Sequence, residues 1–117
     1  HPEVAINLNN LAQLLQATNR LGEAEPLMRR ALAMDEQSYG PDHPTVAIRL
    51  NNLARLLLAT NRMEEAEPLM RRALIIFTRS LSDAHPNTLS VQKNYSDLLR
   101  AMGRSPEQIR EALAEAR

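Results

Sequence analysis

Apolar residues recur in the first part of the chain at intervals of three and four positions, the spacing of one face of an α-helix. The first stripe consists of Val4, Leu8, Leu11, Ala12 and Leu15. After a polar break at Asn19-Arg20, a second stripe consists of Ala24, Leu27, Met28, Ala31 and Leu32. The pattern predicts two amphipathic helices joined by a turn.

The same pattern returns with a period of 42 residues. The segment HPEVAINLNNLAQLLQATNR at 1–20 is followed by HPTVAIRLNNLARLLLATNR at 43–62, and EAEPLMRRAL occurs twice unchanged. About two-thirds of the positions in the first unit are identical in the second. We predict one domain over 1–117, with repeat 1 at 1–42, repeat 2 at 43–84, and a degenerate repeat 3 with a C-terminal cap at 85–117. Helix boundaries are expected near Asn19, Pro44, Asn61, Pro86 and Arg104.

A single helix pair cannot bury both of its apolar stripes, so neighbouring pairs are expected to stack on a shared core. This predicts an all-α fold, a curved solenoid of three antiparallel helix pairs without strands. Ala31 and Ala73 are expected where two helices approach closely. The segment 105–108, Ser-Pro-Glu-Gln, is typical of a capping box that opens a shorter and more charged last helix. The first helix is expected to present apolar side chains on its N-terminal side, as in a trimmed array.

Histidine and proline mark the start of each unit. Gly40 can take a left-handed conformation that ends one helix, Asp42 or His43 can cap the next, and Pro44 fits its first turn. Pro26 and Pro68 are also interpreted as first-turn prolines. The three histidines, His1, His43 and His85, occupy the same place in successive units. We therefore expect them to start helices, because helices stacked about 8–10 Å apart would keep them from sharing one metal ion.

Charge and composition narrow the classes of partner. Fourteen basic residues balance fourteen acidic ones, whereas nucleic-acid binding usually requires a positive excess. There is no cysteine, no apolar run long enough to cross a bilayer, and no catalytic triad or phosphate-binding loop. We expect no nucleic-acid or membrane partner, no cofactor or metal, and no enzymatic activity. A cytoplasmic fragment of a longer protein is the expected source.

The order of large and small positions resembles the tetratricopeptide repeat, through Leu8, Leu11, Ala12, Leu15, Ala24, Met28 and Ala31. Repeats of this family usually have about 34 residues. Here the extra length lies at the end of the second helix and in the connection at 39–44, which resembles the kinesin light chain type. The resemblance covers essentially the whole chain and weakens after Tyr95, where Gln108 and Glu115 replace small alanines. It implies a right-handed α-solenoid that binds a peptide or protein along a concave groove lined by the first helices.

The first helices carry amides where a solvated face would normally carry charges. The predicted groove residues are Ile6, Asn9, Asn10, Gln13, Ile48, Asn51, Asn52, Arg55, Lys93, Asn94, Asp97 and Arg100. Asparagine can donate and accept hydrogen bonds at once, so it can pair with the backbone of an extended peptide. Alternatively, one asparagine of each pair braces the neighbouring helix. Among these groove residues, Arg55, Lys93 and Arg100 outnumber Asp97, and this slight positive excess favours acidic peptides. The lysine and asparagine clamp by which some family members hold a terminal carboxylate is not reproduced.

The arginine pairs at 29–30 and 71–72 are expected to lie on a solvated outer face. Glu25 and Glu67 precede Arg29 and Arg71 by four residues, which is the favourable order for ion pairs within a helix. Two functions are therefore weighed. The first is a binding module for a peptide or protein segment. The second is a structural spacer or self-assembly element, with weak association between chain ends.

Overall fold

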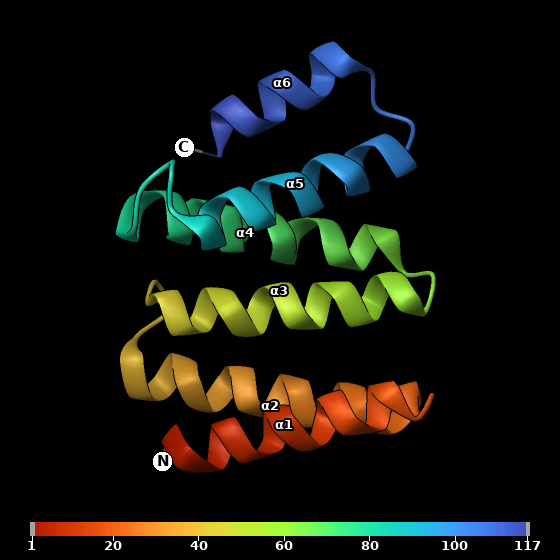
Figure 1. Ribbon diagram of the computed structural model, residues 1–117, viewed down its shortest axis with the longest axis vertical. Coiled ribbons are helices and arrows are strands. Elements are labelled where there is room, and N and C mark those ends of the chain that lie inside the picture. The colour runs from red at the N-terminus through yellow and green to blue at the C-terminus, as the bar shows by residue number, and fades with distance from the viewer. Residues whose placement is uncertain (1, 117) are drawn as a thin grey trace.

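The computed structural model describes residues 2–116, which form six α-helices and no strand. The helices are α1 (Pro2–Ala17), α2 (Leu21–Tyr39), α3 (Pro44–Ala59), α4 (Met63–Ser80), α5 (Pro86–Ala101) and α6 (Pro106–Glu115). Each packs on its neighbours in chain order, so that α2 lies between α1 and α3, and α4 between α3 and α5 (Figure 1). The predicted all-α stack of three antiparallel pairs is confirmed. Every predicted boundary falls in a turn or at the first residue of a helix.

The turns within the three pairs share one backbone device. Asn19, Asn61 and Gly103 occupy equivalent positions 42 residues apart, and their φ angles are 62°, 61° and 88°. A left-handed conformation is strained for most residues but accessible to glycine and, at lower cost than for others, to asparagine. The polar break at Asn19-Arg20 therefore supplies an asparagine at the position where the chain turns back with a positive φ.

The histidines at the start of α3 and α5 are N-caps, as predicted. In each, the imidazole Nδ1 accepts a hydrogen bond from the backbone N–H two residues later, from Thr45 to His43 and from Asn87 to His85, both at 3.1 Å. His1 lies outside the described residues. The capping box at the start of α6 is also present, with Ser105 and Gln108 each bonding the other's backbone N–H.

Two local predictions need correction. Gly40 has the expected positive φ of 90°, but its ψ of 159° is extended and not left-handed helical. Pro26 and Pro68 lie in the second turn of their helices, not the first, at the sixth residue of α2 and α4. Each removes one helical donor, to the carbonyl four residues earlier. Those carbonyls belong to Gly22 and Glu64, which are exposed and accessible to water.

The core is complete only where a neighbouring pair covers it. Val46 and Leu53 on α3 are fully buried, whereas their equivalents on α1, Val4 and Leu11, are 41% and 47% exposed. The difference arises because α2 packs on α3, while no helix among residues 2–116 covers the same side of α1. Part of the predicted core stripe of α1 is therefore surface, and the expected apolar N-terminal side is confirmed.

The last helix pair packs differently from the first two. The helix α6 has 10 residues against 19 in α2, and it is tilted away from the stack in Figure 1. Gln108 and Glu115 are exposed where α2 has the fully buried Ala24 and Ala31. Long polar side chains at these two positions prevent the close approach that alanine allows, as the sequence predicted.

Candidate functional site

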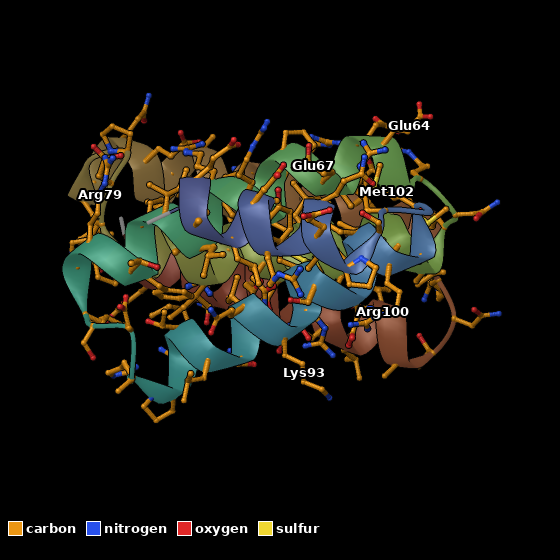
Figure 2. The ribbon with its side chains drawn as sticks, turned by 90° about the horizontal axis from the view of Figure 1, so that it is seen from above. Glu64, Glu67, Arg79, Lys93, Arg100 and Met102 are labelled. Carbon is orange, nitrogen blue, oxygen red and sulfur yellow. The ribbon has the colours of Figure 1, made fainter. Side chains whose placement is uncertain are left out.

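All predicted site residues lie on α1, α3 and α5, the first helix of each pair. Figure 2 looks down the stack and separates two sides of the molecule, with Lys93 and Arg100 of α5 on one side and Glu64 and Glu67 of α4 on the other. We call these the first-helix face and the second-helix face. The exposed predicted residues are Ile6, Asn10, Gln13, Ile48, Arg55, Lys93, Asp97 and Arg100. Asn51, Asn52 and Asn94 are half-buried, and Asn9 is buried.

Three hollows lie between successive first helices. The first, of 290 Å³ between α1 and α3, is lined by Gln13, Gln16, Ala17, Met28, Asn52 and Arg55. The second, of 130 Å³ between α3 and α5, is lined by Ile48, Asn51, Asn52, Phe77, Asn87, Ser90 and Val91. The third, of 440 Å³, is lined by Arg55, Leu58, Asn61, Met63, Asn94, Asp97, Leu98 and Ala101. Asn52 is shared by the first two hollows and Arg55 by the first and third, so these two residues form the centre of the face.

The two asparagines of each pair have different surroundings. Asn9 is only 4% exposed, and its Oδ1 accepts a long hydrogen bond of 3.5 Å from Nδ2 of Asn52. Asn9 therefore does not lie on the exposed face as predicted, because adjacent helical residues point about 100° apart and it turns toward the packed side. Its repeat equivalent, Asn51, has a buried Oδ1 without a hydrogen-bond partner among the described residues. Asn52 and Asn94 line the hollows, and Asn51 also lines the second one.

The third hollow contains an apolar wall that the sequence reading missed. Leu58, Met63 and Leu98 are partly or fully buried and line it together with the polar Asn94. The signal available in the sequence was Leu58, which occupies the position of Gln16 in the first repeat. This hollow offers space for an apolar side chain beside groups that can hydrogen-bond.

Three arginines lie together near the C-terminal end of α5 and the start of α6. Arg100 and Asp97 form an exposed ion pair at 3.0 Å. A further hollow of 310 Å³ is lined by Arg100, Arg104, Pro106, Ile109 and Arg110. Within residues 2–116, the side chains of Arg104 and Arg110 have no acidic partner. This hollow is therefore lined by basic side chains, although α6 itself also carries Glu107, Glu111 and Glu115.

Several charged side chains of the second-helix face form ion pairs with one another. The predicted pairs within helices are present, Arg29 with Glu25 at 3.0 Å and Arg71 with Glu67 at 3.6 Å. Glu25 also accepts a hydrogen bond from Arg62 of the next pair. Burial raises the pKa of Glu25, but the hydrogen bonds from Arg62 and Arg29 outweigh it and hold that pKa below its ordinary value. Glu64 and Arg79 on this face are exposed and form no ion pair among the described residues, so the face also carries unpaired charge of both signs.

A buried tyrosine joins the last two pairs. The hydroxyl of Tyr95 on α5 donates a hydrogen bond of 2.9 Å to Oε2 of Glu67 on α4. Burial, together with the adjacent carboxylate of Glu67, raises the pKa of Tyr95 to about 12.

In the described part of the chain, no three histidine or acidic side chains are grouped to hold a metal ion. None of the described helices is both long and apolar enough to cross a membrane.

Comparison with known proteins agrees with this geometry. The sequence pattern of the tetratricopeptide repeat family matches residues 3–74 and again residues 50–116. The chain belongs to the tetratricopeptide repeat family. Members of this family generally mediate protein–protein interactions. No curated protein matches the chain significantly.

Solved structures show the same fold. One is described as Podosopora anserina "kinesin light chain nearly identical TPR-like repeats", with a TM-score of 0.81 and 24% sequence identity. The match covers 99% of this chain and 55% of that structure's chain. A variant of the same protein gives a TM-score of 0.82, 24% identity, and coverage of 99% and 54%. The chain thus spans about half the length of these structures and has the fold of kinesin light chain-type repeats.

Proposed function

We propose that the first-helix face binds an extended peptide segment of a partner protein. The observation that supports this most strongly is the continuity of the three hollows, which meet at Asn52 and Arg55. The long axis of the molecule measures 40 Å, which corresponds to about 12 residues of extended chain. A peptide that follows the stack would cross the central pair whichever end it entered from.

The proposed contacts follow from the chemistry of each hollow. Asn52 and Asn94 carry amides that can donate to a peptide carbonyl and accept from a peptide N–H. Between them, the apolar wall at Leu58 and Met63 accepts one apolar side chain of the ligand. Hydrogen bonds from Asn52 and Asn94 to the peptide backbone would provide affinity. The third hollow would provide selectivity for one side chain of the peptide.

The partner segment is proposed to be acidic. Arg55 lines two hollows and has no acidic partner among the described residues. The arginine-lined hollow beside α6 extends this positive character to the end of the face. An acidic residue on the ligand would be attracted there, with an effect that weakens as salt is added.

The test uses a peptide of about 12 residues selected from a randomised library on the full chain, with affinity measured by calorimetry. Asn94→Ala should weaken binding by roughly 1–3 kcal/mol, because a buried peptide group loses its partner. Asn52→Ala should do the same and also removes its bond to Asn9. Arg55→Glu should lower both the affinity and its salt sensitivity. The matched control is Arg71→Glu on the second-helix face, which should change neither. Equal effects of Arg55→Glu and Arg71→Glu would refute the assignment.

A structural spacer is the second candidate, and one observation favours it. The uncovered side of α1 exposes Val4, Leu11 and Leu14, the last of which is 60% exposed. Contiguous apolar surface of this kind promotes association. Sedimentation across a wide concentration range tests this candidate. A reversible rise in mass that Leu14→Glu abolishes would support it, whereas a constant monomer mass would count against it.

A further inference from the structure

One ion pair is buried between the first two helix pairs. Nε of Arg49 on α3 donates a hydrogen bond of 2.7 Å to Oδ2 of Asp35 on α2. The side chains are 9% and 1% exposed, so both charges are removed from water. The other carboxylate oxygen of Asp35 is buried without a hydrogen-bond partner among the described residues. Asp35 therefore depends on Arg49 for its compensation.

The corresponding place in the next interface is apolar. Position 35 of the first unit corresponds to Phe77 in the second, and Arg49 corresponds to Val91 in the third. Phe77 and Val91 are each 2% exposed and line the same hollow. Arg49 also corresponds to Asn7 of α1. Asp35 and Arg49, which both differ between the first and second units, thus face each other in the α2/α3 interface.

The first parts of the two second helices do not distinguish the units. The second helices share EAEPLMRRAL, so that Met28 and Leu32 on α2 recur as Met70 and Leu74 on α4. A wrong pairing would therefore still bury these shared apolar side chains of the second helix. Covering α5 with α2 would set Asp35 against Val91, and covering α3 with the α4 of another copy would set Phe77 against Arg49. Both leave a buried charge without its partner, which is strongly unfavourable.

We propose that Asp35 and Arg49 form a pairing key that determines which second helix covers which first helix. The key directs α2 to α3 and leaves Phe77 of α4 for Val91 of α5. It acts mainly against wrong assemblies, in which a unit is skipped or exchanged between two copies of the chain. Its role is independent of any ligand bound on the first-helix face.

The experiment makes the two interfaces alike in two opposite ways. D35F/R49V gives both interfaces the apolar pair, and F77D/V91R gives both the ion pair. The matched control E36A/R72A removes another ion pair between helix pairs, one that is about one-third exposed. Each full-length protein is refolded from denaturant over a range of concentrations, and its mass is measured by light scattering before and after dilution. Oligomers that persist after dilution indicate helices exchanged between copies of the chain. Oligomers formed by reversible association through α1 dissociate on dilution.

We expect both key variants to raise the ratio of persistent oligomer to monomer by at least about tenfold over the original chain and the control. The two variants are independent, so the failure of one to fold leaves the other to decide. The proposal is overturned if each folded key variant yields the same persistent oligomer fraction as the original chain at every concentration.

Discussion

Replacing Arg49 by valine would leave Asp35 as a buried carboxylate with no cation beside it. Asp35 is 1% exposed, and among the described residues its side chain accepts a single hydrogen bond, from Arg49. Breaking a buried pair from one side typically costs about 3–5 kcal/mol. In a chain of 117 residues this corresponds to a fall in Tm of roughly 10 °C or more. R49V is therefore expected to be among the most destabilising single changes at this interface.

The double variant should behave quite differently. The protein already packs phenylalanine and valine at the equivalent place in its second interface, where both are buried. D35F/R49V is therefore expected to fall within about 1 kcal/mol of the original stability or to exceed it, since apolar replacement of a buried pair is often neutral or stabilising. A double-mutant cycle of the original chain, D35F, R49V and D35F/R49V should then give a coupling free energy of at least about 3 kcal/mol between the two positions.

The assay is urea unfolding followed by far-ultraviolet circular dichroism, because the chain has no tryptophan. The four proteins of the cycle are compared at the same concentration and salt. A free energy of unfolding for R49V within about 0.5 kcal/mol of the original would show that water already solvates the pair. A double variant as unstable as R49V would show that the two side chains do not compensate each other. Either outcome would refute the reasoning.

Three further predictions concern the core, a helix cap and a buried hydroxyl. Ala73 is fully buried, so Ala73→Leu should overpack the core and lower the free energy of unfolding by about 1–3 kcal/mol in denaturant titration, whereas a neutral result would place it at the surface. Removing the imidazole acceptor by His43→Ala should lower that free energy by about 0.5–2 kcal/mol, with no loss expected if the cap is dispensable. In a Tyr39→Phe background, ultraviolet titration should show Tyr95 ionising near pH 12, and Glu67→Gln should lower that pKa. Because the folded-state pKa is raised above the ordinary value of about 10, the stability contributed by neutral Tyr95 is present below pH 10 and is lost as pH rises toward 12; an ordinary pKa would contradict its burial.

Much of the fold follows from local rules that the sequence displays. The apolar period predicts the helices, and the 42-residue repeat predicts how many pairs stack. Helix starts at His43 and His85 and the capping box at Ser105 depend on residues only two or three positions apart. Interactions of this range can be read directly from the order of residues.

Other features depend on which helices meet. Asn9 and Asn52 differ in burial because adjacent helical positions face different neighbours, although both belong to the same repeated Asn-Asn pair. Asp35 and Arg49 are 14 residues apart and look like ordinary surface charges until α2 packs on α3. The apolar wall at Leu58 likewise forms only when α5 is added. These features are set by tertiary packing, so no local pattern could predict them.

The central claim is that a peptide binds along the first-helix face. The most direct test is to titrate the isotopically labelled full chain with a library-selected acidic peptide and map the shifted nuclear magnetic resonance signals. The account predicts that the largest shifts fall on Asn52, Arg55 and Asn94, with little change at Arg29 or Arg71. Shifts that cluster around Arg29 and Arg71, or a library that yields no ligand competing for the first-helix face, would contradict it.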